Sequence, residues 1–145
     1  MLKSHKELDV WQKAFELCKD IYRLSSRFPA DERFGLIAQT RRCAVSVPSN
    51  IAEGYNRGAT RDYIRFLWIS NGSLAELDTQ LLLASELGYA PSAECEPVFD
   101  NIARIERMLR AMIRSLEAKS TKSPSASSPI PRSPIPKTSQ ATSTP

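Results

Sequence analysis

Histidine and glycine are scarce in this sequence, and each scarcity excludes a class of site. The single histidine, His5, excludes the paired-histidine zinc helix, Cys/His zinc fingers and the Glu-x-x-His pairs of di-iron bundles. It also leaves Ser-His-Asp or Cys-His catalysis without a base inside the folded body. The five glycines are scattered, so none builds a phosphate-binding loop. We therefore expect no enzymatic activity, no metal and no cofactor.

Cysteines and long apolar runs are also few. The three cysteines are far apart, odd in number and without a C-x-x-C pair, which is typical of reduced, buried thiols. The first residues contain no apolar signal-peptide region, and no run approaches the length of a membrane span. These absences predict a cytoplasmic protein with no membrane partner.

The charge and composition of the chain divide it into two parts. Of 20 basic and 16 acidic residues, three basic and no acidic ones follow residue 119, so residues 1–119 carry a net charge of only +1. Residues 120–145 hold 8 Ser, 6 Pro and 4 Thr and no aromatic residue, a composition typical of disorder. We predict one domain over 1–119 and a disordered tail over 120–145. The tail contains a tandem repeat, Ser128–Arg132 and Ser133–Lys137, which is either solvated polyproline II or a docking peptide.

Apolar periodicity predicts four amphipathic helices and no strand in the domain. Their expected ranges are Asp9–Arg27, Asp31–Gly54, Thr60–Leu87 and Ser92–Lys119. The expected end signals are Asp9 and Thr60 as N-caps and Gly54 and Gly88 as stops. Short connections between the helices predict an all-α fold, an antiparallel up-down four-helix bundle. Pro48 predicts a kinked second helix, with two shorter helices as the alternative.

The third helix has the clearest pattern. Its packing seam follows strict 4-3 spacing and comprises Tyr63, Leu67, Ser70, Leu74, Leu77, Leu81 and Ala84. A second apolar stripe lies on a different flank and comprises Ile64, Trp68, Ala75 and Leu82. A helix with two apolar flanks is central in its bundle or shared with another subunit, so Ile64, Trp68 and Leu82 are predicted at an oligomer interface.

Two groups of arginines are candidates for nucleic-acid binding. One is a stripe on the fourth helix, formed by Arg104, Arg107, Arg110 and Arg114. Guanidinium groups suit phosphate recognition, but the stripe also fits a solvated helix face on which Asp100 and Glu117 pair with the arginines.

The other group, Arg57, Arg61 and Arg65, surrounds the turn before the third helix together with Tyr55 and Tyr63. Aromatic stacking plus phosphate contact is a scheme for single-strand recognition. The alternative is a polar turn in which Asp62 offsets part of the positive charge.

Two further sets have structural interpretations. Arg41 and Arg42 point about 100° apart on the second helix, so one can face a partner while the other forms a salt bridge within the bundle. The candidate acids for that salt bridge are Glu53, Glu76 and Asp78. Ser70–Ser73, which contains Gly72, is interpreted as permitting close helix approach.

These residues resemble a known family, the four-helix-bundle proteins encoded in 23S ribosomal RNA intervening sequences. The resemblance covers about residues 5–118 and is carried by Leu8–Ala14, Phe28-Pro29, Glu32–Leu36, Arg41–Gly54, Gly72–Leu81 and Glu86–Tyr89. Its most specific part is Pro48–Gly54 following Arg41-Arg42. The family is also similar to the accessory variability protein of diversity-generating retroelements.

The resemblance implies a homopentameric ring without enzymatic activity. It also implies that a family motif matters, and we interpret this motif as structural: Arg41, Arg42, Pro48, Asn50, Glu53 and Gly54. Our hypothesis is a non-enzymatic oligomer that associates with RNA or DNA through its arginines. The alternative is a protein–protein scaffold or adaptor, for example for a reverse transcriptase, with no direct nucleic-acid binding.

Overall fold

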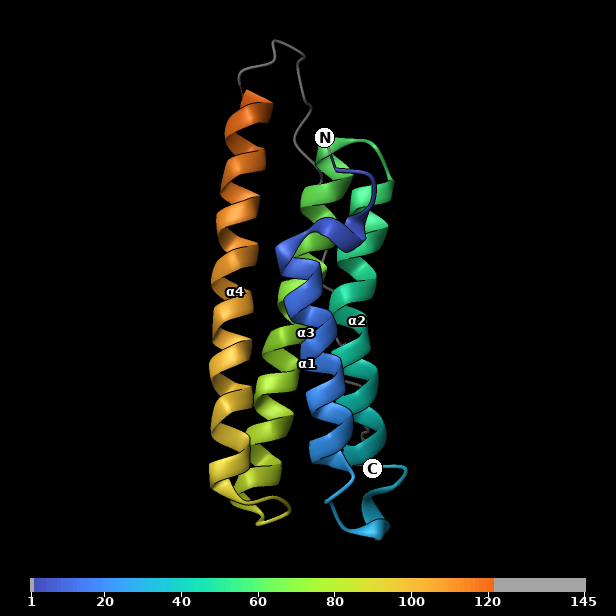
Figure 1. Ribbon diagram of the computed structural model, residues 1–145, viewed down its shortest axis with the longest axis vertical. Helices are drawn as coiled ribbons and strands as arrows, with labels where there is room; N and C mark the ends of the chain where they lie inside the picture. Colours follow the sequence, from blue (N-terminus) through green and yellow to red (C-terminus); the bar gives the residue numbers. More distant parts are fainter. Residues whose placement is uncertain (1, 122–145) are drawn as a thin grey trace, which may run out of the picture.

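The computed structural model describes residues 2–121, and over this range the chain is helical with no strand. Four α-helices follow one another, with short 3-10 turns at His5–Glu7 and Ala30–Glu32 (Figure 1). The helices are α1 (Asp9–Ser25), α2 (Leu36–Asn56), α3 (Thr60–Glu86) and α4 (Ser92–Thr121). The predicted all-α four-helix bundle is confirmed. The predicted tail beyond Thr121, with its tandem repeat, lies outside the described residues.

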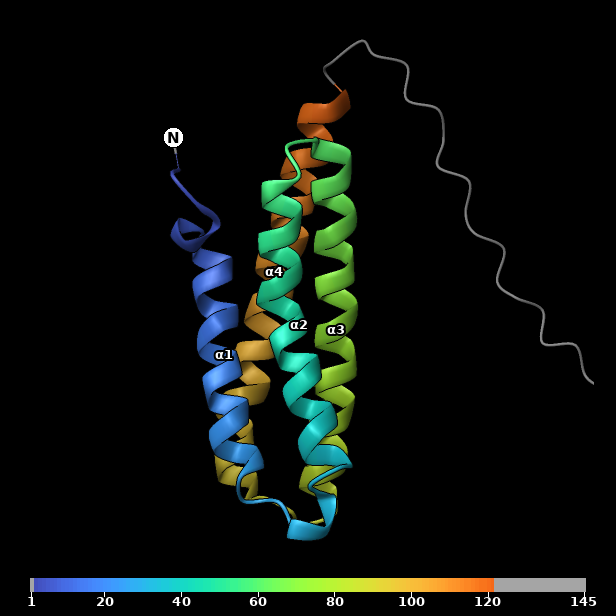
Figure 2. The same cartoon turned by 90° about the vertical axis from the view of Figure 1, so that its right-hand side faces the viewer.

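The four helices form a ring of neighbours. α1 packs against α2 and α4, and α3 packs against the same two helices, with the most extensive contact between α2 and α3. Figures 1 and 2 show each helix running opposite to the next one along the chain. None of the described helices combines the length and apolar character that crossing a membrane would require.

The core follows the predicted seam of α3. Six of its seven residues, from Leu67 to Ala84, are almost fully buried, and Tyr63 is partly buried. The second stripe behaves differently, because Trp68 and Leu82 remain about half exposed. α3 therefore uses one flank to close the bundle and leaves the other uncovered within this chain.

The helix starts predicted at Asp9 and Thr60 are confirmed, but both predicted N-caps and the predicted start of the second helix are wrong. Leu8 rather than Asp9 is the N-cap of α1, and Ala59 rather than Thr60 is the N-cap of α3. α2 begins at Leu36 instead of Asp31, because the preceding residues form a separate 3-10 turn. The carboxylate of Glu32 then accepts a hydrogen bond from the Leu36 amide at 2.9 Å, which satisfies one of the free N–H groups at the start of α2.

The prediction that Gly54 stops α2 is also wrong. Gly54 is a buried residue inside the helix, which continues to Asn56. The left-handed residue that follows the helix is Gly58, with φ at +81°. A Cβ atom on Gly54 would lie only 2.7 Å from Cβ of Phe66 on α3, so this glycine permits close approach of the two helices. The predicted stop at Gly88 is confirmed, with φ at +75°.

Pro48 lies within α2 without breaking it, so the alternative of two shorter helices is wrong. A proline cannot donate to the carbonyl four residues earlier, which here is that of Ala44. The thiol of Cys18 on α1 donates to this carbonyl oxygen at 3.1 Å. The carbonyl oxygen of Val47, the residue before the proline, accepts a hydrogen bond from the hydroxyl of Ser70 on α3 at 2.9 Å. Neighbouring helices therefore supply the polar contacts around the proline.

The buried thiols predict a loss of stability at high pH. Burial raises the pKa of both Cys18 and Cys43 from about 9 to about 11, and the carboxylate of Glu76 adds to the effect at Cys43. Between these values the unfolded chain has lost protons that the folded chain keeps, so stability is full below about pH 9 and falls as pH rises through about 11.

Guanidinium unfolding at about pH 8 and about pH 10.5 measures this loss. A Cys18→Ala/Cys43→Ala variant is expected to lose less stability over that interval than the unmodified chain. An equal loss in both proteins would show that the thiols do not contribute.

Candidate nucleic-acid interface

All seven arginines predicted to bind nucleic acid have exposed side chains. Arg57, Arg61 and Arg65 surround the connection between α2 and α3, whereas the other four lie on α4. They differ in how far neighbouring carboxylates already neutralise them. This difference separates the cations that are free to meet a phosphate from those that are not.

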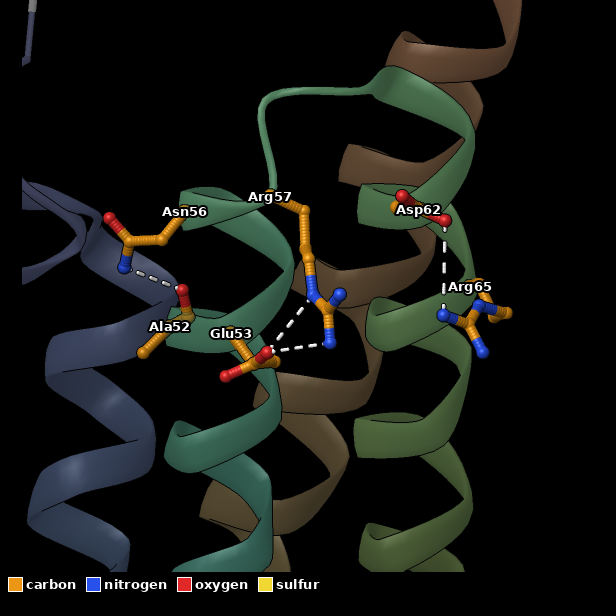
Figure 3. Close-up of polar contacts among 6 residues, drawn as sticks. All are labelled: Ala52, Glu53, Asn56, Arg57, Asp62 and Arg65. Carbon is orange, nitrogen blue, oxygen red and sulfur yellow. Dashed lines mark hydrogen bonds and ion pairs between the residues drawn. The ribbon is translucent and has the colours of Figure 1, made fainter.

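Arg57 is the most strongly engaged arginine. Its Nε and Nη2 atoms donate to Oε1 of Glu53 at 3.0 and 2.9 Å (Figure 3). Arg65 forms a looser ion pair with Asp62 at 3.8 Å (Figure 3), which agrees with the interpretation that Asp62 offsets charge at the start of α3. The guanidinium carbons of both arginines lie near the ring of Phe66, 5.3 and 4.9 Å from its centroid.

The two tyrosines expected to stack on bases pack within the bundle instead. Tyr55 and Tyr63 are partly buried and pack edge to face with ring centroids 6.0 Å apart. The Tyr63 hydroxyl donates to Sδ of Met112 on α4 at 3.6 Å, and burial raises the pKa of Tyr63 to about 12. Sequence reasoning missed Phe66, although its position directly after Arg65 was a signal.

Arg110 connects α4 to α3. It pairs with Glu106 at 3.2 Å, and its guanidinium carbon lies 5.9 Å from the ring centroid of Trp68. The expected pairing of the stripe with Asp100 and Glu117 is wrong, since neither forms an ion pair within residues 2–121. Glu106 stands four residues before Arg110, the favourable spacing on a helix, and it is the acid that reaches the stripe.

The contact between Arg110 and Trp68 brings the two arginine groups together. α3 and α4 run in opposite directions (Figure 1), so one turn beyond Arg110 corresponds to one turn before Trp68. Arg114 therefore lies near the level of Ile64, and Arg61 is less than one further turn away. Around the axis of α4, Arg114 lies about 40° from Arg110, and around the axis of α3, Arg61 lies within about 40° of Trp68. Arg61 and Arg114 therefore lie on the same side of the bundle as the contact between Arg110 and Trp68.

Four of the seven arginines form no ion pair with the part of the chain that the structure describes. They are Arg61, Arg104, Arg107 and Arg114. An exposed guanidinium without a carboxylate partner can donate two hydrogen bonds to a phosphate at no cost in broken ion pairs. These four side chains are the strongest candidates for phosphate contact.

Arg41 is directed into the bundle instead. Its Nε donates to Oγ of Ser25 at 2.8 Å and its Nη2 donates to the carbonyl oxygen of Tyr22 at 3.2 Å. The guanidinium carbon also lies 4.6 Å from the Tyr22 ring centroid. The predicted salt bridge of Arg41 or Arg42 is therefore wrong within residues 2–121. The last turn of α1 supplies neutral acceptors at its negative dipole end.

Asn50, another motif residue, lies beside a polar contact between α2 and α3. Nδ2 of Asn50 donates to the Ser46 carbonyl at 2.8 Å, and the Ser46 and Ser73 hydroxyls are 2.6 Å apart. Arg42 is exposed beside this polar pair. Gly72 is not part of the close approach, since nothing lies within 4 Å of where its Cβ would be. Within the segment Ser70–Ser73 of α3, the two serines contact α2 and Gly72 does not.

Metal ligands do not gather in the described part of the chain. Within residues 2–121, no three His, Cys, Asp or Glu side chains lie close enough together to hold a metal ion. The thiols of Cys18 and Cys43 donate to backbone carbonyl groups, and their raised pKa values favour the protonated form. The surface of this bundle therefore offers guanidinium groups, and its described interior offers no activated nucleophile.

Comparisons with known proteins identify relatives of this fold. The model of the family described as 23S rRNA-intervening sequence protein matches residues 6–111. A crystal structure of a protein of unknown function from the S23 ribosomal protein family, from Bacteroides thetaiotaomicron VPI-5482, superposes with a TM-score of 0.67. It shares 23% sequence identity, and the match covers 72% of this chain and 97% of that one. No curated protein matches the sequence.

Proposed function

Because the chain belongs to the family of 23S rRNA-intervening sequence proteins, we propose that it is a non-enzymatic, cytoplasmic protein that binds RNA. The observation that carries this proposal is the surface on α3 and α4 where Arg61, Arg104, Arg107 and Arg114 form no ion pair within residues 2–121. Contact with the phosphate backbone is the interaction that such side chains favour.

The modest charge of the domain limits the mode of binding. With a net charge of only +1 over residues 1–119, long-range attraction is weak, so binding depends on the local arrangement of arginines. Tyr55 and Tyr63 are packed on each other, so the two aromatic residues predicted to stack on bases are already engaged. We therefore propose contact with the backbone of structured RNA rather than recognition of single-stranded bases.

Self-association is the second part of the proposal. The stripe of α3 predicted as an oligomer interface keeps Trp68 and Leu82 about half exposed, and Ile64 is only partly buried. Large apolar side chains gathered on one helix face favour burial by another subunit. A ring of five copies, as the family resemblance implies, would carry five sets of unpaired arginines and raise the affinity for a long RNA.

The test is a salt titration of RNA binding by the full chain. The probe is a labelled, structured fragment of 23S ribosomal RNA, with an unrelated hairpin for comparison. A variant with Arg104→Gln, Arg107→Gln and Arg114→Gln is expected to bind about tenfold more weakly and to lower the salt slope by about 2 to 3, because it loses three phosphate contacts.

A control variant removes the same net charge elsewhere. Lys19, Arg23 and Arg27 are each held in an ion pair, with Glu16, Asp20 and Glu94 respectively. Their replacement by Gln is expected to leave RNA affinity within about twofold. If both triple variants lose affinity equally, binding reflects net charge alone. If the unmodified chain binds no RNA, the protein–protein scaffold becomes the better explanation.

A further inference from the structure

A surface that plays no part in the proposed RNA binding runs between α1 and α2, which lie side by side (Figure 2). Two hollows of about 300 and 460 Å³ share Phe15, Cys18 and Val45 and so form one groove. We call it the α1–α2 groove. Its other apolar lining residues are Trp11, Tyr22 and Pro48.

Three apolar side chains in the α1–α2 groove are unusually exposed. Phe15, Tyr22 and Val45 are 46%, 47% and 42% exposed, although they sit in the middle of regular helices. Trp11 stacks on Phe15 with ring centroids 5.0 Å apart, which extends the apolar wall toward the start of α1. A contiguous apolar patch of this kind marks an interaction site.

The spacing of these residues matches a helical partner. Trp11, Phe15, Cys18 and Tyr22 follow one another at intervals of 4, 3 and 4 residues, and Val45, Ser49 and Ala52 face them at intervals of 4 and 3. Both walls therefore repeat at the heptad period that receives the apolar seam of another helix. The twelve residues from Trp11 to Tyr22 span about 16 Å, or three helical turns.

The charges around the groove indicate the sign of the partner. Its lining includes Lys19 and Arg23 and no carboxylate. Arg41 lies over the Tyr22 ring and donates only to the neutral Ser25 hydroxyl and a carbonyl group. Lys19 and Arg23 already pair with Glu16 and Asp20 on α1, so Arg41 is the cation at this rim that has no carboxylate partner within residues 2–121. Acidic residues flanking an apolar seam would complement this rim.

Two other occupants fit less well. To stack on these rings, nucleobases would have to displace two cations. Arg41 lies over the Tyr22 ring, and Nζ of Lys19 lies 5.7 Å from the Phe15 centroid. The chain's own residues 122–145 contain three basic and no acidic side chains and a proline at every second position of their repeat. The charge of such a sequence does not complement the basic rim.

We propose that the α1–α2 groove binds an acidic amphipathic helix of a partner protein, in the helix-in-groove mode. The apolar seam of that helix would cover Phe15, Tyr22 and Val45, and its acidic flank would meet Arg41. This inference goes beyond RNA binding and rests on different residues, so either can fail without the other.

The test uses the full chain and a labelled 21-residue synthetic peptide with leucine at heptad positions a and d and glutamate at e and g. Fluorescence anisotropy is expected to show saturable binding, and Val45→Glu is expected to weaken it at least about tenfold. The matched control is Phe34→Glu, which adds the same charge at a highly exposed residue outside the groove. It should change affinity less than about twofold.

A second peptide with lysine in place of glutamate is expected to bind at least about tenfold more weakly. Equal binding of the two peptides, or equal loss in Val45→Glu and Phe34→Glu, would overturn the proposal. So would displacement of the peptide by single-stranded RNA, which would assign the groove to nucleic acid. A change in sedimentation caused by Val45→Glu alone would assign it to a second copy of the chain.

Discussion

Replacing Gly54 by alanine is expected to lower the free energy of unfolding by about 2 kcal/mol. The added Cβ would lie 2.7 Å from Cβ of Phe66 and 3.3 Å from the carbonyl oxygen of Tyr63. Neither atom belongs to a flexible side-chain end, so α2 and α3 would have to move apart. The strain outweighs the gain of about 0.5–1 kcal/mol that alanine brings to a helix interior.

The control for this prediction lies on the neighbouring helix. Gly72 is also helical, but nothing lies within 4 Å of where its Cβ would be, so Gly72→Ala is expected to raise stability by about 0.5–1 kcal/mol. Urea unfolding of the two variants should therefore give shifts of opposite sign. A stabilised Gly54→Ala variant would contradict the close α2–α3 approach.

Replacing Leu77 by alanine is expected to cost about 3 kcal/mol, within the range for a buried leucine in a rigid core. Leu77 is fully buried on the seam of α3, and its removal leaves a cavity in the core. Leu82 stands five residues later on the same helix but is 49% exposed. Leu82→Ala is expected to change the unfolding free energy of the isolated chain by less than about 0.5 kcal/mol.

The two leucines separate folding from assembly. If α3 is shared between copies, Leu82→Ala should shift the protein toward smaller species at a given concentration, while leaving the fold intact. Sedimentation velocity at several concentrations measures this shift, and circular dichroism checks the fold. An unchanged distribution of species would remove Leu82 from the proposed oligomer interface.

Most of the fold was predictable because helix formation depends on residues three and four positions apart. The seam of α3 from Leu67 to Ala84 was identified from spacing alone, and its burial is confirmed. The N-caps were less predictable than the helix starts. Asp9 and Thr60 are good capping residues by type, yet the helices begin at these residues and are capped by Leu8 and Ala59, since a cap needs only a compatible backbone turn.

The candidate interface was predictable in its residues but not in its charges. The sequence placed arginines on two helices, but only the structure separates Arg57, held by Glu53, from Arg61, which has no ion pair within residues 2–121. The contact of Arg110 with Trp68 joins residues 42 positions apart. No local pattern encodes such a contact, because it depends on how α3 and α4 are packed.

Periodicity and composition were sufficient to establish the four helices, their apolar faces and the break in composition after residue 119. The roles of Gly54, Cys18 and Arg41 were decided by tertiary packing. Each acts on an atom of another helix: Cβ of Phe66, the Ala44 carbonyl and the Tyr22 carbonyl. Local sequence specifies a helix through contacts within one turn, whereas these contacts exist only after helices distant in sequence have come together.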